Sequence, residues 1–254
     1  MLLLVTDTSG KDGFVGLVRA GEGSEPDKID VIEEVPLDGG TFSAQLVPQI
    51  SGLLKKHNFA KADIGAFVVV SGPGSFTGLR VGLAAIKALS EILHKPIVSV
   101  SLLEVLAPYS RMIAAGHDEG NRPALLPYAV ALDAGRGEAF VGHFEMLIGQ
   151  DDARYKPMGE SLLTLSSLAA LIDSGTTKWI STPDPSIFEA LAAKVAASNR
   201  SKIRRNLRRP RSEEVAGIGW QKLRAGQTVS PEQLEANYMR HSDAEIFSRP
   251  ASSS

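Results

Sequence analysis

The sequence predicts an α/β protein made of two related lobes, each a mixed sheet with flanking helices. Three observations support this fold class. Short apolar runs alternate with helical patterns along the chain, a glycine-rich loop joins an apolar run to a helix at residues 71–83, and a hairpin near the N-terminus recurs in the second half. Alternating strands and helices are typical of sheets covered by helices, and a recurring unit indicates duplication.

The recurring hairpin begins at the end of an apolar strand in each half. Residues 2–6 lead to Asp7, and residues 128–132 lead to Asp133. When residues 7–16 are laid on residues 133–142, the aspartate and a Phe-Val-Gly triplet coincide. Each copy is predicted to be strand, tight turn and strand. Short hairpins share glycine and β-forming residues, so coincidence is the alternative to duplication.

The segments between and after the hairpins are assigned from apolar spacing and helix-start signals. Helices are predicted at about 42–54, 76–93, 162–172, 187–197 and 213–224, and Pro48 forces a late start or a kink in the first of them. Strands are predicted at 66–70, 97–100 and 179–181. Ser101 and Glu104 form a capping box that opens a further helix. We expect a first lobe at 1–105 with the helix at about 213–225 packed back on it, a second lobe at 106–212 and a tail at 226–254.

Composition limits the classes of function. The chain has 254 residues, a net charge of −2, 43% hydrophobic and 22% charged residues, and no cysteine. A nearly neutral chain has no general attraction for nucleic acid or membranes. The missing cysteines exclude disulfides, thiolate metal sites and a cysteine nucleophile. The chain also lacks an apolar run of membrane-spanning length and a signal segment, so we expect a soluble, cytoplasmic protein.

The glycine-rich loop is expected to work at a surface. Ser75 or Thr77 can cap the helix that follows, and an open helix start attracts anions. However, the spacing matches neither common phosphate-binding motif, no lysine follows the last glycine, and Arg80 is the nearby cation. The small residues Gly78, Gly82 and Ala85 share one helical face. This flat face predicts close approach of another helix, either inside the lobe or on a partner.

A basic patch runs from Arg200 to Arg211 and contains no aromatic residue to stack on a base. Its central cations, Arg204, Arg205, Arg208 and Arg209, can hold RNA phosphates. A solvated connection is the alternative interpretation. The five histidines show no metal-binding spacing.

Four segments of the chain resemble the TsaB (YeaZ) family of the actin/hexokinase/Hsp70-like (ASKHA) superfamily. They are Asp7-Thr8-Ser9, the glycine-rich block 71–83, the segment 132–138 and Tyr238-Met239-Arg240. The resemblance covers nearly the whole chain, and the glycine-rich block is its most specific part. In the tail, Ala236-Asn237 stands where the family pattern has proline and a variable residue.

The resemblance implies a non-catalytic partner subunit in tRNA threonylcarbamoyladenosine (t6A) synthesis. Such a subunit pairs with a TsaD-like catalytic subunit and a TsaE-like ATPase, acts on tRNA through the complex, and needs no cofactor of its own because nucleotide and metal belong to the partners. The expected partner interface is Gly74, Ser75, Phe76, Thr77, Gly78, Arg80, Gly82 and Ala85. Whether the chain forms a homodimer when alone stays open.

The resemblance also implies a vestigial nucleotide cleft at Asp7, Thr8, Ser9 and Asp133. Superfamily ATPases place one carboxylate from each half beside the phosphates and metal. The alternative is that both carboxylates only cap turns. Two other functions are kept open: a stand-alone ASKHA kinase or ATPase, and a protein related to M22-type metallopeptidases.

Overall fold

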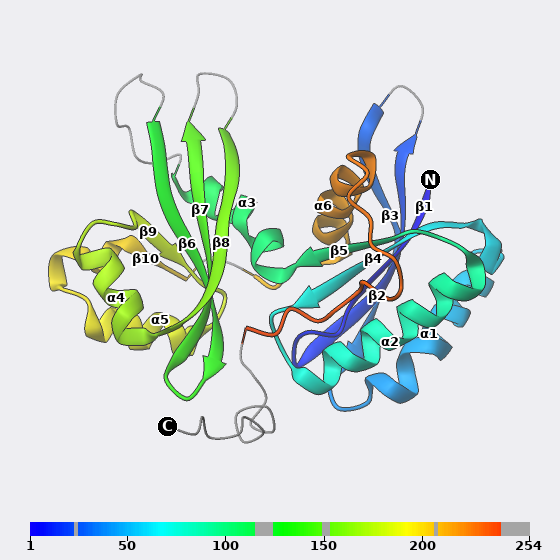
Figure 1. Cartoon of the computed structure of the whole chain (residues 1–254), viewed down its shortest axis with the longest axis horizontal. Coiled ribbons are helices and arrows are strands. Elements are labelled where there is room, and N and C mark those ends of the chain that lie inside the picture. Colours follow the sequence, from blue (N-terminus) through cyan, green and yellow to red (C-terminus); the bar gives the residue numbers. More distant parts are fainter. Residues whose placement is uncertain (23–24, 115–123, 149–152, 206–207, 240–254) are drawn as a thin grey trace, which may run out of the picture.

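The structure is a computed structural model that describes residues 1–22, 25–114, 124–148, 153–205 and 208–239. It has two lobes side by side, each containing a five-stranded mixed sheet. Figure 1 shows the first lobe on the right and the second on the left. This arrangement confirms the predicted α/β fold class.

The first sheet has the strand order β3-β2-β1-β4-β5. Its strands are β1 Leu2–Asp7, β2 Asp12–Glu22, β3 Glu25–Asp38, β4 Ile64–Gly72 and β5 Ile97–Ser101. The first three strands are antiparallel, while β4 and β5 run parallel to β1. β1 is buried along its whole length because helices cover both faces of the sheet.

The second sheet has the order β10-β9-β6-β7-β8 and repeats the same pattern. Its strands are β6 Ala124–Gly135, β7 Glu138–Ile148, β8 Ala153–Thr164, β9 Trp179–Ser181 and β10 Ile203–Arg204. Again three strands are antiparallel and two run parallel to the first. Equivalent strands therefore occupy equivalent places, as expected for a duplicated lobe. The turns differ: Asp7 lies opposite Phe14, whereas Asp133 lies opposite Ala139.

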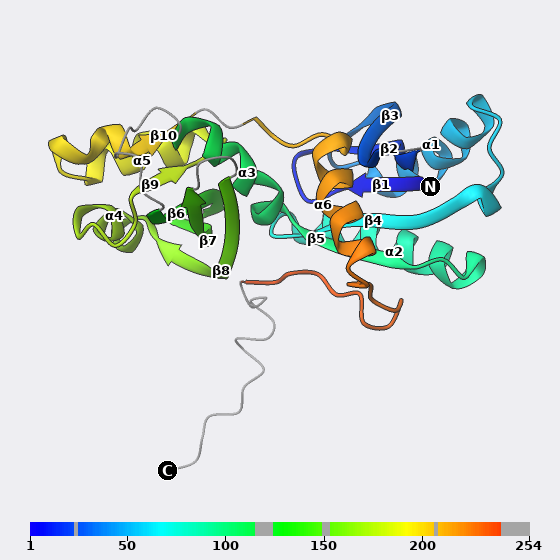
Figure 2. The same cartoon turned by 90° about the horizontal axis from the view of Figure 1, so that it is seen from above.

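In each lobe the sheet lies between helices on its two faces, which gives three layers (Figures 1 and 2). The helices are α1 Phe42–Lys56, α2 Phe76–Leu93, α3 Leu102–Ala114, α4 Leu165–Asp173, α5 Pro185–Lys194 and α6 Ser212–Arg224, with short 3₁₀ turns at Lys61–Asp63 and Ala197–Lys202. One core lies under α1 and α2, another under α4 and α5, and a central core around α3 and α6 joins the two sheets. Among the described residues, no helix is long and apolar enough to cross a membrane.

Some predicted elements differ in detail. α1 begins at Phe42 with Pro48 inside the helix, so the proline does not delay its start. The predicted helix at 162–172 begins later, at Leu165, because residues 162–164 pair with β7. The predicted capping box is only half formed: Leu103 N donates to Ser101 Oγ, but the Glu104 carboxylate pairs with Lys222 Nζ of α6 at 2.5 Å. The ion pair with Lys222 takes the place of the bond that Glu104 would accept from the Ser101 backbone N–H in a full capping box.

Candidate functional site

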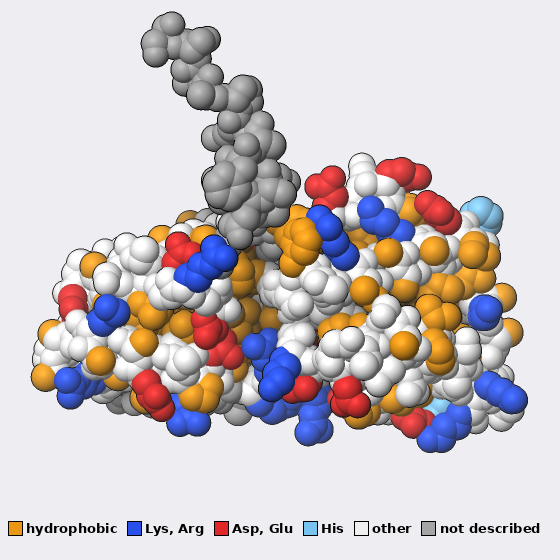
Figure 3. Space-filling model, turned by 90° about the horizontal axis from the view of Figure 1, so that it is seen from below, with side chains coloured by type: hydrophobic (Ala, Val, Ile, Leu, Met, Phe, Trp, Pro, Cys, Tyr) orange, Lys and Arg blue, Asp and Glu red, His pale blue; other side chains and the backbone are white. Residues whose placement is uncertain are grey.

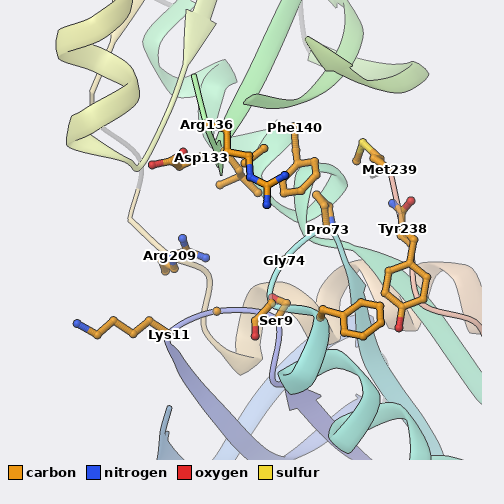
Figure 4. Close-up of a pocket in the computed structure, with 16 residues that line it drawn as sticks. Ser9, Lys11, Pro73, Gly74, Asp133, Arg136, Phe140, Arg209, Tyr238 and Met239 are labelled. Carbon is orange, nitrogen blue, oxygen red and sulfur yellow. The ribbon is translucent and has the colours of Figure 1, made fainter. Parts of the chain in front are cut away.

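A cavity of about 470 Å³ lies where the two lobes face each other (Figure 4). The first lobe lines it with residues 9–11 of the β1–β2 turn and 73–76 at the start of α2. The second lobe contributes residues 132–134, Arg136 and Phe140. Arg209 and residues 237–239 complete the lining. Segments far apart in sequence thus meet at one site, and both copies of the recurring hairpin contribute to it.

The glycine-rich loop reaches the β1–β2 turn because it has no side chain at Gly74. A Cβ there would lie 2.1 Å from the Ser9 carbonyl oxygen, and Ser75 N donates to that same oxygen at 2.7 Å. α2 then begins at Phe76, with Ser75 Oγ accepting from Gly78 N at 3.3 Å. Ser75 is therefore the cap of the two candidates, and the start of α2 opens toward the cavity.

Asp7 is buried behind the cavity and does not line it. Its carboxylate accepts hydrogen bonds from Ser9 N at 2.8 Å and Ser9 Oγ at 2.6 Å. Burial raises the pKa of Asp7, while the bonds from Ser9 and the charge of Arg209 oppose the shift. Thr8 is buried as well. Of the predicted cleft residues in this strand end, Ser9 is the one that reaches the cavity wall.

Asp133 occupies the equivalent strand end of the second lobe and does line the cavity. Its Oδ1 accepts from Gly135 N at 2.7 Å, and its Oδ2 accepts from Ser186 Oγ at 3.0 Å. Asp7 and Asp133 thus both accept a bond from the backbone N–H two residues ahead, which is the turn-capping geometry. The two carboxylates share a local role but differ in burial, since Asp133 is exposed.

Three cations line the cavity: Lys11, Arg136 and Arg209. Figure 4 shows them coming from three different segments. Arg136 has a φ of 57° and lies between Gly135 and Gly137, which also have positive φ. Arg209 forms an ion pair with Asp184 at 3.3 Å. Sequence reasoning missed Lys11 and Arg136. Their positions in the two equivalent hairpin turns were the signal that could have found them.

An aromatic cluster forms one side of the cavity mouth. The Phe76 and Tyr238 rings are 5.1 Å apart, and the Arg80 guanidinium lies 3.7 Å from the centre of the Phe76 ring. Arg80 Nε also donates to the Tyr238 hydroxyl at 3.1 Å. A tilted ring contact and a hydrogen bond therefore join the start of α2 to the segment that follows α6.

The flat glycine face of α2 packs inside the first lobe. A Cβ at Gly78 would lie 2.2 Å from the Thr8 carbonyl oxygen, and a Cβ at Gly82 would lie 2.2 Å from Thr8 Oγ1. Both glycines are buried, and Ala85 is half-buried. Gly78 and Gly82 therefore allow α2 to approach the end of β1. The exposed face of the helix carries Arg80, Ala84 and Ala88 instead.

The basic patch connects β10 to α6, and several of its cations have partners. Arg204 lies over the Trp179 ring at 5.8 Å, and burial lowers its pKa. Arg208 pairs with Glu214 of α6. Arg205 is exposed. These contacts give the connection a structural role in addition to any contact with RNA.

The described residues contain no group of three histidine or acidic side chains that could hold a metal ion. His57 Nε2 lies 2.7 Å from Glu33, and His143 Nε2 lies 2.8 Å from Ser161 Oγ. Burial lowers the pKa of His143. His117 and His241 lie outside the described residues. His57 and His143 thus each contact one neighbouring side chain rather than a group of metal ligands.

Comparisons with known proteins find relatives in the synthesis of a modified tRNA nucleoside. A TsaD protein of Wolbachia pipientis subsp. Culex pipiens, a tRNA N6-adenosine threonylcarbamoyltransferase, is 32% identical over 201 residues, covering 76% of this chain and 55% of the relative. TsaB of Bacillus subtilis, a tRNA threonylcarbamoyladenosine biosynthesis protein, is 30% identical over 145 residues, covering 57% of this chain and 56% of the relative. A TsaD protein of Anaplasma marginale is 37% identical over 101 residues, covering 40% of this chain and 26% of the relative.

The chain therefore spans about a quarter to just over half of these curated relatives. Among solved structures, YeaZ from Pseudomonas aeruginosa has a TM-score of 0.68 at 21% identity, covering 93% of this chain and 99% of that one. This likeness shows a common two-lobed fold. The model of the family "TsaD: tRNA N6-adenosine threonylcarbamoyltransferase" matches residues 40–247. Because that match covers most of the sequence, the chain belongs to this family, and it has the fold of its YeaZ (TsaB) proteins.

Proposed function

We propose that the chain is a non-catalytic subunit of tRNA threonylcarbamoyladenosine synthesis that binds and activates a TsaD-like catalytic subunit, together with a TsaE-like ATPase. The observation that carries the proposal is the family match over residues 40–247 on a chain with the YeaZ fold. One relative is a tRNA threonylcarbamoyladenosine biosynthesis protein and the other a tRNA N6-adenosine threonylcarbamoyltransferase, which supports tRNA as the final substrate of the complex.

The geometry of the cavity supports a role without catalysis by this chain alone. A catalytic site of this kind needs carboxylates that face a bound metal or phosphate. Here Asp7 is buried off the cavity, and Asp133 is engaged by Gly135 and Ser186. Nucleotide and metal are accordingly expected on the partner subunits. Purified chain should not form t6A from threonylcarbamoyl-AMP by itself.

The exposed faces of α1 and α2 support a partner interface in the first lobe. Val47 of α1 is 51% exposed, and the small residues Ala84 and Ala88 lie on the outer face of α2. Figure 3 shows apolar side chains over this face of the first lobe. Small residues let a partner helix approach closely. Of the predicted interface residues, Gly74, Ser75, Phe76, Thr77 and Arg80 are exposed, Ala85 is half-buried, and Gly78 and Gly82 are buried against Thr8.

Two substitutions test this interface. Ala84→Arg and Ala88→Arg place long charged side chains on the exposed face without entering the core. Ala193→Arg, at an exposed position of α5 in the second lobe, is the matched control. We expect the α2 variants to weaken the complex with the TsaD-like subunit at least about tenfold, equal to about 1.4 kcal/mol. Gel filtration and calorimetry measure this loss. Normal binding by both α2 variants would reject the interface.

Reconstitution tests the function as a whole. The chain is combined with the TsaD-like and TsaE-like proteins of the same organism, tRNA and threonylcarbamoyl-AMP, and t6A is measured by mass spectrometry. Omitting the chain should abolish product, and the α2 variants should lower it in proportion to lost binding. Full product without the chain would overturn the proposal, and product from the chain alone would assign it the catalysis.

The basic connection supports contact with tRNA in the assembled complex. Arg205 is exposed, and Arg204, Arg208 and Arg209 lie near it in sequence. Reversal of Arg205 alone to Glu leaves the ion pairs of Arg208 and Arg209 intact. We expect this variant complex to bind tRNA more weakly and with a shallower salt dependence. Equal affinity at low salt would leave the patch as a connector between β10 and α6.

One observation favours a second candidate function. The cavity between the lobes is lined by Lys11, Arg136 and Arg209, as a phosphate-binding site would be. A stand-alone ASKHA kinase or ATPase would bind Mg-nucleotide there, and calorimetric titration of the purified chain distinguishes this function from a partner role.

A relationship to metallopeptidases would instead require bound metal, which elemental analysis of the purified protein measures.

A further inference from the structure

The segment that follows α6 runs along the first lobe and ends between the lobes. We call residues 229–239 the strap. Figures 1 and 2 show it leaving α6, passing the first sheet beside α2 and reaching the side of β8. Val229 N donates to Ile97 O at 2.9 Å, and Leu234 is buried in the core beneath α2. The strap is therefore anchored on the first lobe before it reaches the cavity.

Asn237 joins the strap to both lobes. Its backbone N donates to Ser71 O of β4 at 2.7 Å, and its Nδ2 donates to Glu160 Oε2 of β8 at 2.6 Å. The other oxygen of Glu160 accepts from Ser101 Oγ at the end of β5. One carboxylate of the second lobe is thus held by two donors, one from the strap and one from the first sheet. A hydrogen bond to a charged group is stronger than one between neutral groups.

The next two residues of the strap form part of the cavity wall. The Tyr238 ring packs against the Phe76 ring in a tilted contact, the Tyr238 hydroxyl accepts from Arg80 Nε, and Met239 packs against the central core. Asn237, Tyr238 and Met239 all line the cavity (Figure 4). The lobes are already joined by the central core around α3 and α6 and by the bond between Ser101 and Glu160, and the strap adds a further connection at the cavity itself.

We propose that the strap fixes the separation of the lobes through Asn237 and Glu160, and that its release opens the cavity between them. The two lobes pack on the shared central core around α3 and α6, and a short segment with a few bonds at the cavity can set the angle between the lobes about that core. Because Tyr238 binds Phe76 and Arg80, the same segment links the opening of the cavity to the start of α2. The strap is a conformational device within the chain and does not depend on any partner.

The test first removes the hydrogen bond between Asn237 and Glu160 and then restores it with donor and acceptor exchanged. Asn237→Asp replaces the amide donor with a carboxylate facing Glu160, so the two side chains repel each other. Adding Glu160→Gln restores the pair, because the new amide can donate to the new carboxylate and still accept from Ser101. Glu235→Gln, an exposed position in the same strap, is the matched control.

The separation of the lobes is measured on the full chain as the distance between two spin labels, by pulsed electron paramagnetic resonance. The protein has no cysteine, so Lys61→Cys in the first lobe and Glu189→Cys in the second can be labelled without background. Both positions are exposed. Asn237→Asp should shift the distance distribution and broaden it, the added Glu160→Gln should restore it, and Glu235→Gln should leave it unchanged.

Two further readouts keep the result decisive. Circular dichroism checks that each variant is folded. Tyr238→Phe tests the strap without a change of charge, since it removes the hydrogen bond from Arg80 and keeps the ring contact with Phe76. Hydrogen exchange at the backbone amides of residues 9–11 and 74–76 should be faster in Asn237→Asp than in the parent chain. A distance distribution and exchange rates equal to the parent in the folded Asn237→Asp variant would overturn the proposal.

Discussion

Substitution of Gly78 by alanine should destabilise the protein, although alanine is the better helix former. Gly78 is buried in the first turn of α2, where a Cβ would lie 2.2 Å from the Thr8 carbonyl oxygen and 3.2 Å from the Phe42 ring. The carbonyl belongs to the backbone that follows β1 and cannot rotate away. The added methyl group therefore forces α2 and the end of β1 apart, which disturbs both the core and the cavity wall.

The magnitude follows from two opposing effects. Adding a methyl group to a well-packed core typically destabilises by about 1–3 kcal/mol. Replacing glycine by alanine in a helix contributes up to about 1 kcal/mol in the other direction, and less in the first turn. With about 0.5 kcal/mol for the opposing contribution, we expect a net loss of about 0.5–2.5 kcal/mol. Gly52 of α1 is the matched control, because it is exposed and a Cβ there would meet nothing within 4 Å. Gly52→Ala should stabilise by about 0.5–1 kcal/mol.

Urea unfolding followed by circular dichroism measures both changes, and thermal unfolding checks them. In a chain of this size each kcal/mol shifts the melting temperature by about 2–4 °C, so the two variants should move in opposite directions. A Gly78→Ala variant as stable as the parent would refute the close packing of α2 on Thr8. Equal destabilisation by both substitutions would show that backbone effects, rather than contact with Thr8, control the result.

Four other substitutions have expected outcomes in the same unfolding assay. Lys222→Met should destabilise by about 1–3 kcal/mol, between the values for exposed and buried pairs, because it leaves Glu104 unpaired; a change below the error of the assay would contradict this. Ser75→Ala should lower stability by about 1 kcal/mol and Thr77→Ala by under about 0.5 kcal/mol, and the reverse order would reject Ser75 as the cap. Burial raises the pKa of Asp7, so the folded state binds the proton of Asp7 more readily than the unfolded chain does. The contribution of Asp7 to stability is complete below about pH 3.9, the pKa of an unperturbed aspartate, and is lost as the pH rises from there through the raised pKa of the folded state. The stability difference between Asp7→Asn and the parent should therefore grow with pH across that window, and a constant difference would refute the shift.

The central strands of the fold could be predicted because burial makes them continuous apolar runs. β1 and β4 are covered on both faces, and their residues are almost all apolar. The edge strands β3 and β8 were not assigned, since charged and polar residues interrupt them and one long side faces solvent. β10 has two residues and carries no pattern at all. Sheet position, which is a tertiary property, decides how visible a strand is in the sequence.

The small-residue face of α2 shows a different limit. Helical spacing correctly predicts that Gly78 and Gly82 share one face, but it does not say which surface that face meets. The structure answers this through Thr8, which is distant in sequence and has no distinguishing pattern. The same holds for the contact between Arg80 and Tyr238, whose partners are 158 residues apart. Periodicity identifies faces, and only the fold identifies their partners.

The two aspartates show why the duplication predicts topology better than chemistry. Equivalent strand ends and equivalent turn caps follow from the recurring hairpin, because they depend on local sequence. The environment of each carboxylate depends on what packs around it, and here the copies differ: Asp7 is buried off the cavity, while Asp133 is exposed on its wall. A site that needs one carboxylate from each lobe at a common ion requires both to reach it. The unequal burial of the pair therefore supports the proposed partner role, in which the two lobes would serve as a scaffold for the cavity and for the exposed face of α2.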